Sequence, residues 1–241
     1  MRLAVLADIH GNLEALQAVW EDVQRREVDA VYCLGDMVGY GPDPLAVLEF
    51  LEAHGVRMVQ GNHEWALMGV GRSIWFNFLA QMALQRTRVL LGRPAMRRLQ
   101  ALPYARVAHD CRFVHGFPPE SCMKYLFKAG RAELQVMFRH LRQRICFVGH
   151  THLLGWMEWA DGRVLRHSLR EGEHPVDPAT RHVINVGSVG QPREHDKRAK
   201  YVIWDAARHR LEVMALTYDA QTTAAKIIAR GIPKAYATKL L

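Results

Sequence analysis

Side chains of the types that bind divalent metal ions recur along the chain in short motifs. The motifs are Asp-x-His, Gly-Asp, Gly-Asn-His, Val-His-Gly and Gly-His-Thr-His, and their candidate ligands are Asp8, His10, Asp36, Asn62, His115, His150 and His152. Two divalent cations about 3.5–4 Å apart can clamp phosphoryl oxygens and deprotonate a water molecule near neutral pH. Such a pair needs several oxygen and imidazole ligands and one shared carboxylate. The residues therefore predict phosphate-ester chemistry at a centre with two metal ions.

Each motif follows or ends a short apolar run that predicts a buried strand. These runs cover residues 3–8, 29–36, 56–62, 106–116 and 144–152. A single histidine near a strand end is more often structural, but the recurrence at successive strand ends favours a common site. In an open α/β sheet the carboxyl ends of the strands converge on the ligand crevice. We therefore expect the candidate ligands to meet there.

Helical patterns separate these strands. Leu13, Leu16, Trp20 and Val23 recur at three- and four-residue spacing and predict a helix over 12–26. Further helices are expected at 44–55, 133–144 and within 219–230, and further strands at 182–190 and, as a hairpin, at 200–216. Residues 73–100 carry no strand pattern and predict helices with a break at Gly92-Arg93-Pro94. The order predicts an α/β fold in one domain, 1–241, with two sheets and a helical insertion at about 70–100.

The motifs also carry a family resemblance. The chain resembles the calcineurin-like metallophosphoesterases, most closely their compact bacterial and archaeal, phosphodiesterase-like branch. The matching segments are DIHGN (8–12), LGDMVGYGPDP (34–44), GNHE (61–64), VHG (114–116), GHTH (149–152) and INVGSVGQPR (184–193). The resemblance implies a four-layer α-β-β-α sandwich of two mixed sheets flanked by helices, with the metal site at the carboxyl ends of the strands.

The resemblance also implies roles for the matching residues. Asp36 would bridge the ions and hold a nucleophilic hydroxide that attacks a phosphodiester or phosphomonoester. His63 would protonate the leaving oxygen or stabilise the phosphoryl charge. The first ion would take Asp8, His10 and His152, and the second Asn62, His115 and His150. Manganese is the expected metal, and iron, zinc, nickel or cobalt would also suit these ligands.

Two further residues have two interpretations each. Arg193 is a phosphate contact or a surface arginine, and Asn12 is a helix cap or a phosphate contact. Glu64 stands where many relatives have Asp and is expected to orient His63. With Asn62 and His63, Arg193 and Asn12 are the candidate substrate-binding residues. The expected walls of the substrate pocket are residues 65–80, 117–128 and 155–175.

Composition limits the other functions. The net charge of +8 suits an anionic partner, but Arg and Lys are scattered and no nucleic-acid-binding motif is present. A nuclease or nucleic-acid-binding protein remains one alternative, and a non-catalytic scaffold of the same fold is another; the intact ligand set argues against the scaffold. The cysteines, Cys33, Cys111, Cys122 and Cys146, form no Cys-x-x-Cys pair and are expected to be reduced. No run approaches the ~18 apolar residues of a membrane span, so we expect a cytoplasmic protein. No pattern predicts an oligomeric state.

Overall fold

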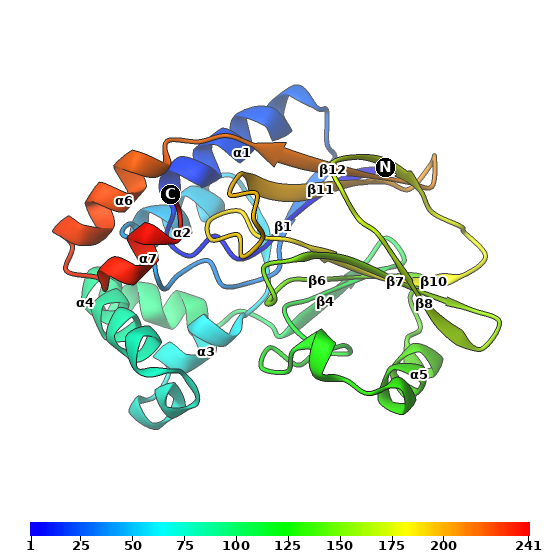
Figure 1. The fold of residues 1–241 in the computed structure, drawn as a ribbon, viewed down its shortest axis with the longest axis horizontal. Coiled ribbons are helices and arrows are strands. Elements are labelled where there is room, and N and C mark those ends of the chain that lie inside the picture. Colours follow the sequence, from blue (N-terminus) through cyan, green and yellow to red (C-terminus); the bar gives the residue numbers. More distant parts are fainter.

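Two β-sheets lie one above the other and carry helices on their outer faces (Figure 1). The computed structural model describes the backbone of residues 1–241 and every side chain except that of Val70. Each sheet has six strands and mixes parallel with antiparallel neighbours. The predicted α/β fold with two mixed, helix-flanked sheets is confirmed.

Three parallel strands in each sheet bring the predicted strand ends together. β1, β2 and β3 are parallel in the first sheet, and β5, β6 and β10 are parallel in the second. The first sheet has the order β3 (Arg57–Met58), β2 (Ala30–Cys33), β1 (Arg2–Leu6), β11 (Ala199–Asp205), β12 (Arg210–Leu216), β9 (Gly172–Pro175). The second has the order β4 (Ala105–Ala108), β5 (Cys111–Val114), β6 (Ile145–Val148), β10 (Arg181–Val186), β7 (Leu154–Ala160), β8 (Arg163–His167).

Most helices gather beside the first sheet, and α5 covers the second (Figure 1). The helices are α1 (Leu13–Arg25), α2 (Pro44–Ala53), α3 (Asn62–Leu67), η1 (Val70–Trp75), α4 (Phe78–Gln100), η2 (Leu126–Lys128), α5 (Arg131–His140), α6 (Ala220–Ala229) and α7 (Lys234–Thr238). Gly92 has a φ of 69° and interrupts α4, as its sequence predicts. No helix in the described part of the chain is long and apolar enough to span a membrane.

The alternation of β1 explains the layers. Leu3 and Val5 belong to the apolar cluster between the sheets, together with Phe113 from the second sheet. Ala4 and Leu6 point the other way and belong to the cluster formed with α1, α2 and α4. A third cluster joins the outer face of the second sheet to α5. Successive strand residues face opposite sides, so one strand serves two cores.

Some predicted elements were wrong in detail. The strand expected over 106–116 is a hairpin of β4 and β5, because His109 and Asp110 both take positive φ angles and form the turn. The strand expected over 56–62 is only β3, two residues long. Strands β7, β8 and β9 and helices α3 and α7 were not predicted. That residues 70–100 are an insertion in a single domain stays a prediction.

Candidate metal centre

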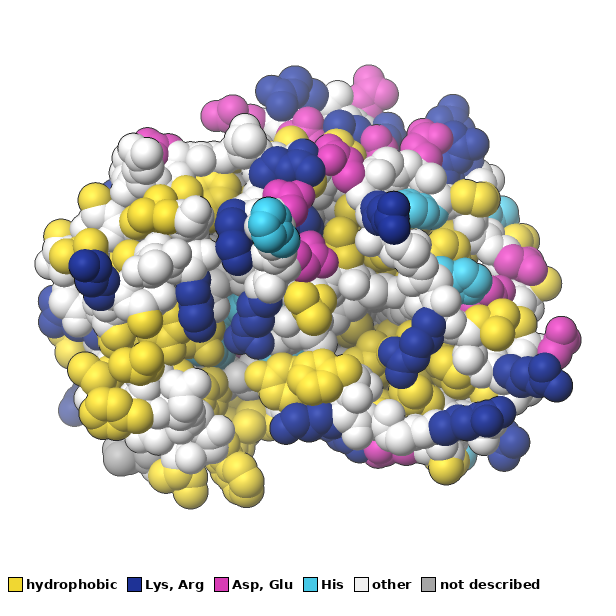
Figure 2. Space-filling view, in the orientation of Figure 1, with side chains coloured by type: hydrophobic (Ala, Val, Ile, Leu, Met, Phe, Trp, Pro, Cys, Tyr) yellow, Lys and Arg dark blue, Asp and Glu magenta, His cyan; other side chains and the backbone are white. Residues whose placement is uncertain are grey.

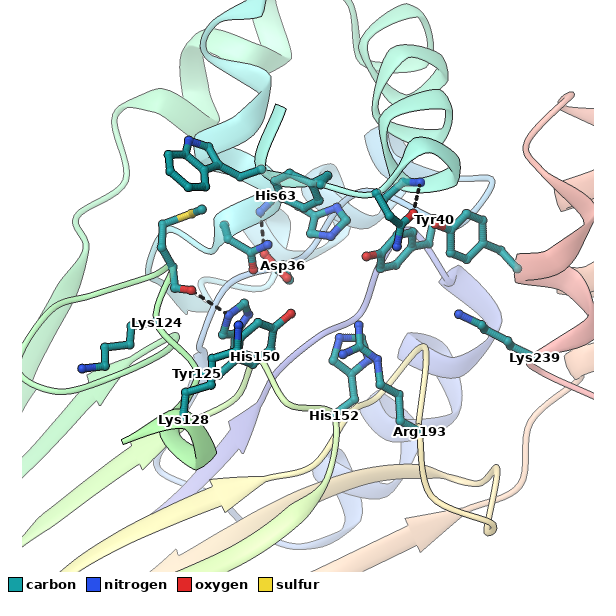
Figure 3. Close-up of a pocket in the computed structure, with 17 residues that line it drawn as sticks. Asp36, Tyr40, His63, Lys124, Tyr125, Lys128, His150, His152, Arg193 and Lys239 are labelled. Carbon is teal, nitrogen blue, oxygen red and sulfur yellow. Dashed lines mark hydrogen bonds between the residues drawn. The ribbon is translucent and has the colours of Figure 1, made fainter. Parts of the chain in front are cut away.

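The strand ends do converge. Ligand atoms of Asp8, His10, Asp36 and His152 all lie within 4.8 Å of one another, and so do those of Asp36, His115 and His150. All six side chains are buried. Asp36 belongs to both groups, so the two clusters share one carboxylate. Figure 3 shows Asp36, His150 and His152 pointing toward the same space.

Backbone carbonyls fix the orientation of the histidine rings. His10 Nδ1 lies 3.0 Å from Val38 O, and His115 Nδ1 lies 3.0 Å from Leu34 O. A carbonyl can only accept, so each Nδ1 carries the hydrogen and leaves Nε2 free to bind a metal. His152 Nδ1 meets Gln191 O in the same way. His150 is reversed: its Nε2 meets Met123 O at 3.2 Å, and its Nδ1 faces the cluster.

The first cluster holds acceptors that face one another. His10 Nε2 and His152 Nε2 are 3.2 Å apart, although neither carries a hydrogen in these tautomers. Asp8 Oδ1 is buried without a hydrogen-bond donor and lies 3.4 Å from His152 Nε2. Burial is the main cause that lowers the pKa values of His10 and His152 well below the usual range, so neither ring supplies a proton. A cation between these atoms would remove the repulsion, so this donor set fits a divalent metal ion.

In the second cluster, a proton on His115 takes the place of a cation. Its Nε2 lies 2.9 Å from Asn62 Oδ1, 3.1 Å from His150 Nδ1 and 3.2 Å from Asp36 Oδ2. Burial opposes its charge, but Asp36 raises the pKa of His115 to about 9. A metal ion here would displace that proton, since ligand imidazoles must be neutral.

The pKa values of the two carboxylates diverge. Burial raises the pKa of Asp8 to about 7. Burial acts on Asp36 in the same sense, but His115 and the neighbouring histidines lower its pKa well below the usual range. Asp36 is therefore ionised at neutral pH, as a carboxylate shared by two cations would be.

The ligands stand on strained backbone. Asp8, His10, Asp36, His150 and His152 all have φ between 50° and 67°, in the left-handed region that non-glycine residues rarely adopt. Such strain persists only where the surrounding structure fixes it, and it clusters at functional sites. A Cβ on Gly61 would lie 2.2 Å from Asp36 Oδ1, so this approach requires glycine.

Glu64 corrects an expectation, because it does not orient the His63 ring. Its carboxylate accepts hydrogen bonds from the backbone N–H groups of Asp36, Gly61 and Val38, at 2.8, 2.8 and 3.2 Å. The extra methylene relative to Asp extends the carboxylate toward the turn after β2. Glu64 thus positions the backbone that presents Asp36.

His63 stands beside the clusters without belonging to either. Its backbone N–H donates to Asp36 Oδ1 at 2.8 Å, and its ring packs against His10, Tyr40 and Phe76. Its Nδ1 is buried without a hydrogen-bond partner. This unused Nδ1 packs against Gly39, where an added Cβ would lie only 2.1 Å from it.

A cavity of about 530 Å³ opens over the clusters. Its lining includes Asp36, Asn62, His63, His150, His152 and Arg193. The expected walls at 65–80 and 117–128 both contribute, through Trp75, Phe76, Asn77, Ala80, Met123, Lys124 and Tyr125. The expected wall at 155–175 was wrong, because those residues form β7, β8 and β9 away from the cavity. Its place is taken by Tyr236 and Lys239, at the C-terminus.

Of the two candidate phosphate contacts, Arg193 and Asn12, only Arg193 lines the cavity. Arg193 lines the cavity and is exposed to it, whereas Asn12 does not line it. Asn12 accepts from Ala15 N at the start of α1, accepts from Thr223 Oγ1 and donates to Gly190 O. With both ends of its amide occupied, Asn12 is the helix cap, and the phosphate-contact alternative has no support in the structure. The cysteines are all buried and free, as expected.

Comparisons with known proteins agree with this site. The sequence profile of the calcineurin-like phosphoesterase superfamily domain matches residues 1–209. The chain belongs to this superfamily. An uncharacterized protein of Methanocaldococcus jannaschii is 31% identical over 239 residues, which cover 96% of this chain and 94% of that protein.

Solved structures and shorter matches extend the comparison. A metallophosphoesterase from Sphaerobacter thermophilus is 32% identical with a TM-score of 0.85, and the match covers 100% of this chain and 98% of that one. A symmetrical bis(5'-nucleosyl)-tetraphosphatase of Erwinia tasmaniensis is 41% identical over 80 residues, only 30% of this chain and 29% of that protein. The superfamily and its members indicate a phosphoesterase with a divalent metal centre and phosphate-ester substrates.

Proposed function

We propose that this calcineurin-like phosphoesterase hydrolyses phosphodiester bonds, phosphomonoester bonds or both, at a centre of two divalent metal ions, with manganese the expected metal. The observation that carries the proposal is the pair of buried ligand clusters that share Asp36 below an open cavity. We assign Asp8, His10 and His152 to one ion, Asn62, His115 and His150 to the other, and Asp36 to both. We propose that the whole chain, 1–241, is a single catalytic domain and that the helices of residues 70–100 form one wall of the substrate cavity.

The bound ions would neutralise the phosphoryl oxygens and acidify a water molecule for in-line attack on phosphorus. The chain's own residues do the rest. Asp36 stays ionised because the surrounding histidines lower its pKa. The carbonyls of Val38, Leu34 and Gln191 hold the imidazoles in the orientation that binding needs.

His63 is proposed to act on the leaving oxygen. Burial lowers the pKa of His63 to about 4, so the ring is neutral until a phosphate anion lies beside it. An anion within a few ångströms favours the protonated ring. A protonated ring could then donate from Nε2 to the leaving oxygen or to the phosphoryl charge, because Nδ1 is buried against Gly39.

The test compares metal-stripped and Mn²⁺-loaded protein on bis-p-nitrophenyl phosphate, with elemental analysis of both samples. We expect activity only with the loaded protein, and about two metal ions per chain. Asp36→Asn is the matched variant, because it changes the shared carboxylate by one atom and should be inactive in either state. Equal rates with and without metal would refute the two-metal mechanism.

A further inference from the structure

Two cationic side chains enter the cavity on one side of the metal clusters. Arg193 follows β10, and Lys239 follows α7 near the end of the chain. Figure 3 shows both pointing into the cavity from the side of His152, whereas Lys124 and Lys128 lie on the side of Tyr125. Lys239 lies beyond residue 209, where the family match ends. Its place in the cavity is therefore a feature of this chain that the family match does not cover.

Arg193 and Lys239 have no acidic partner among the described residues. Of the other two lysines that line the cavity, Lys124 pairs with Glu133, and Lys128 has no acidic partner in the described part of the chain but lies over the Tyr125 ring, 5.3 Å from its centroid. Burial, together with the positive charges of Arg193 and Lys197, lowers the pKa of Lys239. Figure 2 shows Lys and Arg side chains gathered over the hollowed middle of this face. Unpaired like charges in a concave site raise the local concentration of anions.

Packing holds Lys239 in place. On α7, which ends just before Lys239, Tyr236 stacks on Tyr40 with ring centroids 4.4 Å apart. Tyr40 in turn contacts the ring of His63 at 4.4 Å. Leu240, directly after Lys239, is only 4% exposed. The lysine is thus anchored on both sides and set at a defined position relative to His63, so it is not part of a loose tail.

The charge balance leaves these two cations for a second anionic group. In the proposed function, the metal ions and His63 already neutralise the phosphoryl group that is cleaved. The cavity, at about 530 Å³, has room for more than a single phosphate. Trp75, Phe76 and Tyr125 add aromatic surface to its lining. We infer that Arg193 and Lys239 form a second anion subsite, and that the substrate is a phosphate ester carrying at least one further phosphate group. This inference rests on the proposed function.

The kinetic test uses two kinds of substrate with the Mn²⁺-loaded protein. Bis-p-nitrophenyl phosphate carries one phosphate, and diadenosine tetraphosphate carries several. Lys239→Gln and Arg193→Gln should each raise KM for the tetraphosphate by about fivefold to tenfold, because each removes one charge-assisted hydrogen bond at a partly exposed site. KM for the single-phosphate ester should change by less than about twofold, since no second anion is present to lose a contact.

Lys234→Ala is the matched control, because Lys234 begins the helix that Lys239 follows, is exposed and does not line the cavity. It should leave both KM values unchanged. An equal rise of both KM values in Lys239→Gln, or no rise in either, overturns the inference. Hydrolysis of the single-phosphate ester without any hydrolysis of the tetraphosphate also overturns it, while leaving the proposed function intact. If the wild-type protein hydrolyses neither substrate, the result instead contradicts the proposed function.

A binding measurement on metal-stripped protein removes the metal from the comparison. Calorimetric titration with inorganic tripolyphosphate should show binding that Lys239→Gln weakens by about fivefold to tenfold and Lys239→Arg restores. Thermal melting checks that each variant is folded, and the Arg variant separates loss of charge from disturbed packing. Tripolyphosphate binding that is unchanged in Lys239→Gln would overturn the subsite.

Discussion

His10 Nε2 and His152 Nε2 lie 3.2 Å apart in the buried centre, and each ring is held by a backbone carbonyl at its other nitrogen. Neither ring can turn without losing that hydrogen bond. The repulsion between the two lone pairs is therefore built into the fold. A cation between the two rings would remove this repulsion, so we expect the stability of the fold to depend on metal.

Metal binding should raise the melting temperature. Adding Mn²⁺ to stripped protein at about a thousand times its Kd gives about 4 kcal/mol of stabilisation. For a chain of this size each kcal/mol shifts the midpoint by about 2–4 °C, so we expect a rise on the order of 10 °C. Differential scanning calorimetry with and without Mn²⁺ measures it. Asp36→Ala serves as control and should show little rise; a full rise in that variant would contradict a shared carboxylate.

The number of metal ions bound per chain should depend on which of the two ligand clusters a substitution affects. His152→Ala removes a ligand of the first cluster alone, and His150→Ala removes one of the second alone. We expect about one tightly bound metal ion per chain in each variant and about none in Asp36→Ala, because Asp36 belongs to both clusters. Elemental analysis after gel filtration measures the ratio. Loss of both ions in His152→Ala and His150→Ala alike would show that the sites do not fill independently.

His63→Ala should keep both metal ions and lose turnover. General acid catalysis contributes about 10²–10⁴-fold, so kcat should fall in that range for an ester with an alkyl leaving group. A p-nitrophenolate leaves without needing a proton, so the loss there should be smaller if His63 is an acid. Comparing the two substrates measures this difference. Equal losses would assign His63 to the phosphoryl charge, and loss of metal would refute its placement outside the clusters.

The ligands could be predicted from sequence because they lie shortly after the ends of five strands. Gly-Asp and Gly-His-Thr-His mark a strand end locally, and the packing of the two sheets then brings Asp36, after β2, and His152, after β6, together. The cavity wall could not be predicted in this way. Lys239 reaches the cavity only because Tyr236 packs on Tyr40, almost 200 residues earlier in the chain, and no local pattern encodes that contact.

Two of the elements that were not predicted, the β7–β8 hairpin and helix α7, do have a recognisable sequence pattern. Asp161-Gly162 separates two runs with strand composition and is the turn of the β7–β8 hairpin. Pro233 directly precedes α7, a common start of a helix. Glu64 had no such signal. The Glu64 carboxylate accepts from Asp36 N and Gly61 N only because of the shape of the turn after β2, and the spacing of residues in the sequence does not predict that shape.

Glu64→Ala should destabilise the protein strongly. It leaves the buried N–H groups of Asp36, Gly61 and Val38 without their acceptor. An unsatisfied buried group costs about 1–3 kcal/mol, so we expect a loss of about 3–5 kcal/mol in the free energy of unfolding. Glu64→Asp is the matched variant, with the carboxylate kept but withdrawn by one methylene, and should lose less. Urea denaturation of metal-stripped proteins measures both; a loss below about 1 kcal/mol in the alanine variant would contradict the role.

The final prediction concerns the stability of the protein in acid and involves Asp22, which is not part of either ligand cluster. Asp22 Oδ2 accepts from Tyr201 Oη at 2.7 Å and from Arg26 Nε at 2.6 Å. Burial alone would raise the pKa of Asp22, but these hydrogen bonds and the charge of Arg26 lower it below its usual value. A pKa that is lower in the folded state stabilises the protein above the unfolded-state pKa, about 3.9, and this contribution is lost as the pH falls below it.

Wild type and Asp22→Asn should therefore differ most near neutral pH and converge in acid. The charged hydrogen bonds are partly exposed, so we expect a difference of about 1–2 kcal/mol at pH 7. Urea unfolding of both proteins, stripped of metal and measured from pH 7 to pH 3, gives the difference at each pH. Tyr201→Phe keeps the buried ring and removes only the hydroxyl, so it should show a smaller difference that fades in the same direction. A difference that stays constant down to pH 3 would mean that Asp22 contributes through packing, since packing does not titrate.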